Sequence, residues 1–127
     1  MRKPPDTAAI GAAGEDAAQA HLLAHGLKPL ARNVRYRFGE IDLIARDGST
    51  VVFVEVRQRR NDAFGGAAVS VDRRKCARIA RAASAWLAGQ PALAQLPCRF
   101  DVIALSGERD AARIDWIRNA FTLDDLR

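Results

Sequence analysis

The stretch Gly39-Glu40-Ile41-Asp42-Leu43-Ile44, followed by Val51-Val52-Phe53-Val54-Glu55-Val56-Arg57, decides the fold of this chain. Each run is apolar enough to predict a buried strand, the first over residues 39–46 and the second over residues 50–58. Asp47-Gly48 between them is typical of a tight turn, so the two strands are expected to form an antiparallel hairpin. The unusual residues are the carboxylates of Asp42 and Glu55, which are costly to bury unless a cation compensates them.

The geometry of a hairpin brings these two carboxylates together. Side chains alternate along a strand, so any loop with an even number of residues leaves Asp42 and Glu55 on one face of the sheet. A four-residue loop over 47–50 places Asp42 directly opposite Glu55, whereas a two-residue loop places Glu40 there and Asp42 on the diagonal. Directly opposed Cβ atoms lie about 4.5–5.5 Å apart. Two carboxylates so close repel each other, and Mg²⁺, which takes one or two carboxylates and keeps several waters, suits the pair.

Arg57 lies two residues beyond Glu55 and therefore points to the same face. Its guanidinium can hold a phosphate bidentately, or it can neutralise a carboxylate in an ion pair with a purely structural role. Because Asp42 shares that face and a basic helix follows, we favour the metal site over the structural ion pair.

The rest of the chain fits one α/β domain spanning residues 1–127, with residues 1–6 as a loose terminus. An Ala-rich segment over residues 7–25 predicts a helix that ends at Gly26. Ser70 or Asp72 can cap a second helix, which runs to about residue 88. Further strands are expected over residues 27–36, 99–105 and 113–117. The resulting order is αβββαββ, with a mixed central sheet flanked by helices.

The positions of several polar residues allow two interpretations. Glu15 shares a helical face with Ala18 and Leu22, so its carboxylate lies either on the buried stripe or at its margin, in reach of solvent. His21 and His25 sit at helical spacing without the HExxH context of a zinc site, which favours a capping or solvated role.

The cysteines and the apolar pattern restrict the class of protein. Cys76 and Cys98 lack CxxC spacing, and Cys76 falls on an apolar helical stripe, so it is expected to be a buried free thiol. No apolar run approaches the length of about 18 residues that a membrane-spanning helix needs, and no signal sequence follows the basic start. A soluble, cytoplasmic protein with no membrane partner is expected.

The charge is concentrated in one segment. The chain has a net charge of +5, while residues 57–81 alone hold eight basic and two acidic residues, a net charge of +6. Such a block suits a polyanion-binding face, and the alternative is a solvated, arginine-rich surface. The candidate nucleic-acid-binding residues in it are Arg59, Arg60, Arg73, Arg74, Lys75, Arg78 and Arg81.

Asp42, followed 13 positions later by Glu55-Val56-Arg57, resembles the PD-(D/E)xK nuclease signature. A longer series of motifs resembles the YraN-like family of uncharacterised proteins and covers nearly the whole chain, from Gly14-Glu15 to Trp116-Ile117. The motifs are residues 39–44 and 52–57, Gly65-Gly66-Ala67-Ala68, Lys75 and Arg99-Phe100-Asp101-Val102.

This resemblance implies a restriction-endonuclease-like fold, similar to archaeal Holliday-junction resolvases, and Mg²⁺ or Mn²⁺ as cofactor. It gives Glu15 the role of the carboxylate on the first helix, and Asp42, in preference to Glu40, and Glu55 the role of metal ligands. Arg57 occupies the position of the motif lysine. An arginine cannot act as a base, although it can stabilise the charge that develops on a phosphate. Lys75 is expected either to substitute for that lysine in part or to contact phosphate.

Three hypotheses about function remain open. The first is a Mg²⁺- or Mn²⁺-dependent endonuclease for branched or structured DNA, in which the resemblance to resolvases implies a homodimer. The second is a nucleic-acid-binding module that keeps the nuclease scaffold without turnover. The third is an interaction domain whose arginines meet an acidic protein. The aromatic residues mostly suit the core, so no platform for stacking single-stranded bases is expected.

Overall fold

The computed structural model describes residues 7–59, 72–106 and 113–123. The elements are the helices α1 (Thr7–Ala24) and α2 (Arg73–Ala88) and the strands β1 (Lys28–Tyr36), β2 (Gly39–Asp47), β3 (Thr50–Arg59), β4 (Cys98–Ser106) and β5 (Arg113–Phe121). The predicted αβββαββ order is therefore confirmed. The expectation of a loose terminus at residues 1–6 lies outside the described residues, as do Arg60 and the side chain of Arg59.

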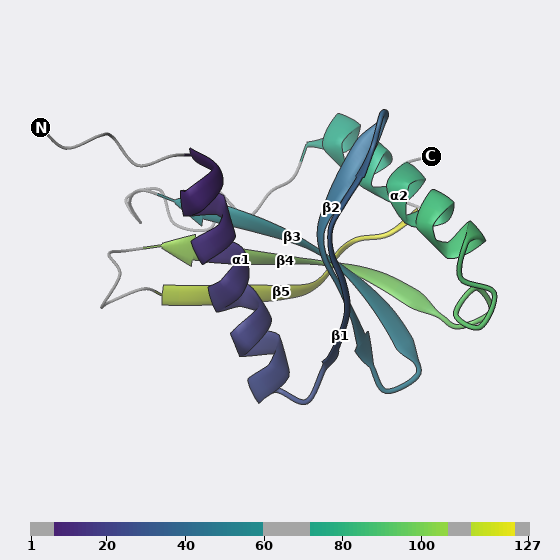
Figure 1. The fold of residues 1–127 in the computed structure, drawn as a ribbon, viewed down its shortest axis with the longest axis horizontal. Helices are drawn as coiled ribbons and strands as arrows, with labels where there is room; N and C mark the ends of the chain where they lie inside the picture. Colours follow the sequence, from purple (N-terminus) through teal and green to yellow (C-terminus); the bar gives the residue numbers. More distant parts are fainter. Residues whose placement is uncertain (1–6, 60–71, 107–112, 124–127) are drawn as a thin grey trace, which may run out of the picture.

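The five strands form one mixed sheet in the order β1-β2-β3-β4-β5. Neighbouring strands are antiparallel except β3 and β4, which are parallel because the chain crosses over through α2 between them. One helix covers each face of the sheet (Figure 1). Val52 and Val54 pack with α1, while the alternating residues Val51 and Phe53 pack with α2. This alternation buries both sides of β3, which explains its continuous apolar run.

The register of the β2–β3 hairpin agrees with one of the two predicted. Leu43 pairs with Val54 and Asp47 with Thr50, which is the register that sets position 42 against position 55. The loop is shorter than the four residues expected for this register, because Asp47 and Thr50 belong to the strands and the turn is Gly48-Ser49. Gly48 has a φ of 59°, a conformation that a tight turn requires and that glycine adopts at no steric cost.

The helices begin and end where the sequence indicates. Gly26, with a φ of 86°, follows α1 as its predicted C-terminal glycine. Of the two predicted caps of α2, the structure uses Asp72, whose side chain accepts a hydrogen bond from the Lys75 backbone N–H at 2.9 Å. Cys76 is buried on the sheet side of α2, as expected. In the described parts of the chain, neither helix is long and apolar enough to cross a membrane.

Candidate metal and phosphate site

Asp42 and Glu55 come together where β2 separates from β3. The pairing of these strands runs from Asp47 and Thr50 as far as Leu43 and Val54. At the next position the carboxylate of Asp42 accepts a hydrogen bond from the Val56 backbone N–H at 2.8 Å. The side chain of Asp42 thus satisfies a backbone donor at the fork between the strands, and this bond fixes its carboxylate beside Glu55.

This pair is electrostatically unfavourable when both carboxyl groups are charged. Burial, and secondly the charge of Glu55, raise the pKa of Asp42 from 3.8 to about 7, with a smaller contribution from Glu15. The hairpin register thus brings the two carboxyl groups close enough for Glu55 to raise the pKa of Asp42. Glu55 is only 6% exposed. The partly buried Asp42 and the buried Glu55 therefore form an acidic centre in which the carboxyl group of Asp42 is partly protonated at neutral pH.

Lys75 is the cation that the fold brings to this centre. Its Nζ lies 2.6 Å from Oε1 of Glu55, although the two residues are 20 positions apart in the chain. The first turn of α2 holds Lys75 in place, since its own backbone N–H is bonded to the Asp72 cap. The sequence named Lys75 as a candidate but gave no signal for this contact, which depends on how α2 packs on the sheet.

The other candidate carboxylates lie at different distances from the centre. Glu15 is mostly buried, and its Oε1 lies 3.4 Å from Nε of Arg32, which also donates hydrogen bonds to Asp16 and to the Ala12 carbonyl oxygen. Of the two readings, the structure favours Glu15 at the buried stripe, near enough to affect the pKa of Asp42. Glu40, by contrast, is exposed and lies 3.7 Å from Arg35, which favours Asp42 as the acidic residue of the site.

Whether a metal ion suits this site depends on the side chains that can serve as its ligands. Within residues 7–59, 72–106 and 113–123, no group of three or more His, Cys, Asp or Glu side chains could hold a metal ion. Asp42 and Glu55 nevertheless supply two carboxylates, which is the number that Mg²⁺ commonly takes from a protein. Arg57, two residues beyond Glu55 on β3, is half-buried. Four further candidate basic residues are exposed along α2, namely Arg73, Arg74, Arg78 and Arg81.

A hollow of about 510 Å³ opens beside this site, between the turn that joins β1 to β2 and the first half of α2. Tyr36 and Phe38 on its wall are stacked at 5.4 Å between ring centroids, and the guanidinium of Arg81 lies 4.4 Å from the centre of the Phe38 ring. Both rings are only partly buried against the core. The aromatic residues mostly belong to the core, as expected, and these two pack against it while they also line the hollow. The lining residues are Tyr36, Arg37, Phe38, Gly39, Glu40, Lys75, Arg78 and Ile79.

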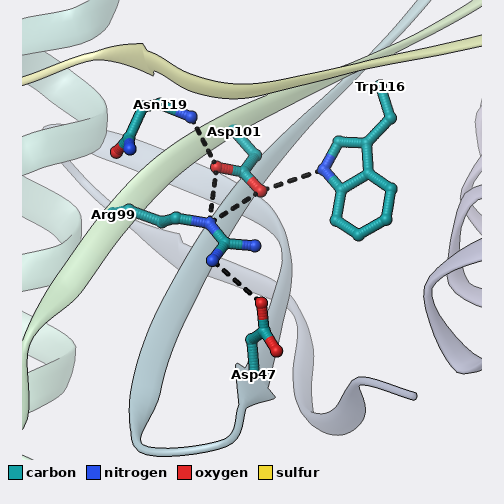
Figure 2. Close-up of polar contacts among 5 residues, drawn as sticks. All are labelled: Asp47, Arg99, Asp101, Trp116 and Asn119. Atoms are coloured by element: carbon teal, nitrogen blue, oxygen red, sulfur yellow. Dashed lines mark hydrogen bonds and ion pairs between the residues drawn. The ribbon is translucent and has the colours of Figure 1, made fainter. Parts of the chain in front are cut away.

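A second buried carboxylate, that of Asp101 on β4, has different surroundings from that of Glu55 (Figure 2). It accepts hydrogen bonds from Nε of Arg99 at 3.1 Å, from the Trp116 indole at 2.9 Å and from the Asn119 backbone N–H at 3.0 Å. Arg99 continues to Asp47 at 2.9 Å and so links β4 to the β2–β3 turn. The bond to Asn119, which has a φ of 52°, holds an irregularity in β5 and extends that strand beyond its predicted end at residue 117.

Trp116 also contacts two histidines, His21 in the last turn of α1 and His25 just after the helix. The imidazole rings of His21 and His25 meet the Trp116 ring edge-on at 5.8 and 5.4 Å between centroids. A ring nitrogen of His25 lies 2.8 Å from the carbonyl oxygen of His21, which fits the expected capping role at the end of the helix. Burial, followed by the charge of His25, lowers the pKa of His21.

Comparison with known proteins gives close relatives over most of the chain. The sequence model of a family described as "Uncharacterised protein family UPF0102" matches residues 14–105. A UPF0102 protein of Xanthomonas campestris pv. campestris (strain B100) is 56% identical over 115 residues, which cover 91% of this chain and 93% of the relative. Another, from Ectopseudomonas mendocina (strain ymp), is 51% identical over 112 residues, which cover 88% of this chain and 93% of the relative.

Proposed function

This chain belongs to the UPF0102 family, as its YraN-like motifs led us to expect, and we propose that it is a metal-dependent nuclease acting on DNA. The observation that carries the proposal is the placement of Asp42 beside the buried Glu55, where the pKa of Asp42 is raised to about 7. A strained acidic pair is what a cation would relieve, and strongly perturbed pKa values gather at functional sites.

Asp101 provides an internal comparison that supports this reading. Its carboxylate receives three donors, one of them the guanidinium of Arg99, so its burial is explained by structure alone. Asp42 has the Val56 N–H as donor and Glu55 as a repelling neighbour. Asp101 is thus paired directly with a cation, whereas at the acidic pair the Lys75 ammonium contacts Glu55 and the pKa of Asp42 stays raised.

Asp42 and Glu55 would hold Mg²⁺ or Mn²⁺, two carboxylates being enough when phosphate and water complete the shell. A divalent ion bound there would supply positive charge to phosphate oxygens and lower the pKa of its water. Arg57 would bind the scissile phosphate through its guanidinium, and Glu15 would orient a water from the α1 side. The basic residues exposed on α2 would follow the DNA backbone.

Lys75 supplies the ammonium group that the nuclease signature carries at the position of Arg57. It reaches Glu55 from α2, and its ammonium group is a compact charge that can bind a water or a phosphate oxygen. We assign it the task of positioning water or phosphate at the acidic pair. This relocation accounts for an arginine in the motif without loss of the ammonium group from the site.

The substrate class follows from the resemblance to resolvases, which favours branched or otherwise structured DNA and a restriction-endonuclease-like fold. A homodimer would place two such sites on the two strands of a junction. Light scattering measures this oligomeric state. The second candidate function is a nucleic-acid-binding module without turnover, and Arg57 in the lysine position is the observation that favours it. The two functions differ only in whether the chain cleaves.

The deciding experiment measures metal binding and cleavage on the same protein. Calorimetric titration with Mn²⁺ is followed by incubation with four-way-junction, flapped and linear DNA. The Asp42→Ala/Glu55→Ala variant is expected to lose metal binding and cleavage together. Asp115→Ala is the matched control, because Asp115 is a carboxylate on β5 that pairs with Arg113 away from the acidic pair and the hollow. DNA binding without metal uptake or cutting by the wild type would reject the nuclease.

A second experiment tests the role of Lys75. Lys75→Ala is expected to lower the cleavage rate while DNA binding weakens little. The double variant Arg57→Lys/Lys75→Ala returns an ammonium group to the motif position, and partial recovery of the rate is expected. A rate that Lys75→Ala leaves unchanged would assign the lysine to Glu55 as a structural counter-charge instead.

A further inference from the structure

We propose that the hollow between the β1–β2 turn and α2 binds one unpaired nucleotide of a DNA flap or single-stranded branch. Its phosphate would lie against Arg37, Lys75 and Arg78, and its base against the Tyr36–Phe38 stack. The ligand class rests on the proposed function, whereas the position and the aromatic contact come from the hollow itself. This inference adds a preference for unpaired strands, which the acidic pair alone does not imply.

The size of the hollow suits a single nucleotide. At about 510 Å³ it falls within the range of roughly 300–1,000 Å³ that small-ligand sites occupy. Gly39 shows how closely its two walls approach, since a Cβ atom there would lie 2.5 Å from the carbonyl oxygen of Arg78. The turn therefore rests directly on α2 at one edge of the hollow. A double helix cannot enter such a space, but an unstacked nucleotide can.

The charges of the lining favour an anion. The wall holds three basic residues, Arg37, Lys75 and Arg78, and one acidic residue, Glu40. Glu40 is already paired with Arg35 at 3.7 Å. Lys75 belongs to both sites, because it lines the hollow and contacts Glu55 at 2.6 Å. A phosphate bound in the hollow would thus lie next to the acidic pair, where the neighbouring phosphodiester would be cut.

The aromatic pair supplies the surface for the base. The Tyr36 and Phe38 rings are parallel to within 1° and are partly exposed. A base could therefore stack on them as a further parallel ring. Arg81 lies over the Phe38 ring and fixes its plane. Stacking on aromatic side chains accepts any base, so the hollow would read the absence of pairing and not the sequence.

Fluorescence anisotropy in EDTA tests the proposal without cleavage. The probes are a short blunt duplex, the same duplex with a single-stranded thymidine flap, and that flap with abasic sites. The wild type is expected to bind the thymidine flap most tightly. Phe38→Leu should weaken binding of the flap about tenfold and leave the duplex unchanged, because stacking on aromatic residues is lost. Arg37→Gln, which changes an exposed turn residue, should also reduce flap binding.

Arg113→Gln is the matched control, because Arg113 is an exposed arginine on β5 outside the hollow. Equal binding of flap and duplex by the wild type would overturn the proposal, and so would a flap preference that Phe38→Leu and Arg37→Gln both retain. The same experiments distinguish a failure of this inference from a failure of the nuclease proposal. If the wild type does not cut with Mn²⁺ but shows a flap preference that depends on Phe38, the nucleotide site stands and the turnover is rejected.

Discussion

At the scale of single residues, Asp101 and Glu55 are both nearly inaccessible carboxylates on adjacent strands, 1% and 6% exposed. Asp101 belongs to a network that joins the β2–β3 turn, β4 and β5 through Arg99 and Trp116. Glu55 instead lies beside a second carboxyl group, whose pKa it raises, and 2.6 Å from the ammonium group of Lys75 on α2. The first arrangement holds strands together, and the second concentrates charge at one point.

Replacing Asp101 by Asn should therefore destabilise the fold without touching the acidic pair. The loss should be about 2–3 kcal/mol, below the roughly 3–5 kcal/mol for an uncompensated buried charge, because Arg99 keeps its ion pair with Asp47. Urea unfolding measures the loss. Asp115→Asn is the control, because Asp115 pairs with Arg113 near the surface and should cost at most about 1 kcal/mol. A loss at Asp101 no larger than at Asp115 would contradict the structural role.

Asp42→Asn should change how the stability of the metal-free protein depends on pH. The pKa of Asp42 is raised from 3.8 to about 7, so the folded state binds the proton more tightly than the unfolded state. The resulting stabilisation is complete below about pH 4 and is lost as pH rises towards 7, at about 1.4 kcal/mol per pK unit. Asn keeps an acceptor for the Val56 N–H but does not titrate. The stability of the variant is therefore expected to decline less than that of the wild type between pH 4 and pH 7.

The measurement is the urea midpoint in EDTA between pH 4 and pH 8, for the wild type and Asp42→Asn side by side. The difference between the two proteins isolates the carboxyl group from other titrating residues. Parallel curves would show that Asp42 has an ordinary pKa in solution. With Mn²⁺ present, the wild type should gain more stability at pH 8 than at pH 5, because the metal binds the deprotonated carboxylate.

At the scale of elements, the β1–β2 turn and α2 depend on each other through Gly39. Gly39→Ala places a methyl group against the backbone of Arg78, which cannot move aside as the end of a side chain could. Overpacking of this kind costs about 1–3 kcal/mol, and the turn is expected to shift away from α2. The variant should melt at a lower temperature and bind the flap probe less tightly.

Gly11→Ala is the matched change in an open position. Nothing lies within 4 Å of a Cβ atom at Gly11, which belongs to α1, so alanine should stabilise the helix by about 0.5–1 kcal/mol. A melting temperature for Gly39→Ala that is equal to or higher than that of the wild type would contradict the close packing of the turn on α2.

The elements themselves follow from local signals in the sequence. Period-two alternation, the Asp47-Gly48 signal and the Asp72 cap predicted the hairpin and α2, and they placed Asp42 against Glu55. Partners that depend on tertiary packing could not be predicted in this way. An aspartate in an apolar strand looks the same at position 101 as at position 42, and its partners decide between a structural and a functional role. The contact of Lys75 with Glu55 is of the same kind.

At the scale of the whole molecule, the positive charge gathers on the side that carries the acidic pair. The chain has a net charge of +5, and its basic segment continues from the end of β3 into α2. The exposed arginines of α2 stand next to the hollow and the site, while β5 lies at the far edge of the sheet. A polyanion approaching this side would be guided to the place where its backbone could be cut.

Binding to duplex DNA should therefore weaken steeply with salt, in proportion to the number of phosphates neutralised. The slope of log K against log salt concentration is about −0.9 for each phosphate on B-DNA. Arg74→Gln removes one exposed charge from α2 outside the hollow, and it should reduce the slope by about 0.9. Arg113→Gln on β5 should leave the slope unchanged. Anisotropy titrations at several salt concentrations give both values. An equal effect of the two variants would place the DNA elsewhere on the surface.

If Arg74→Glu/Arg78→Glu leaves DNA binding intact, the arginines of α2 serve a different partner, such as an acidic protein, because reversed charges on the contact face repel phosphate.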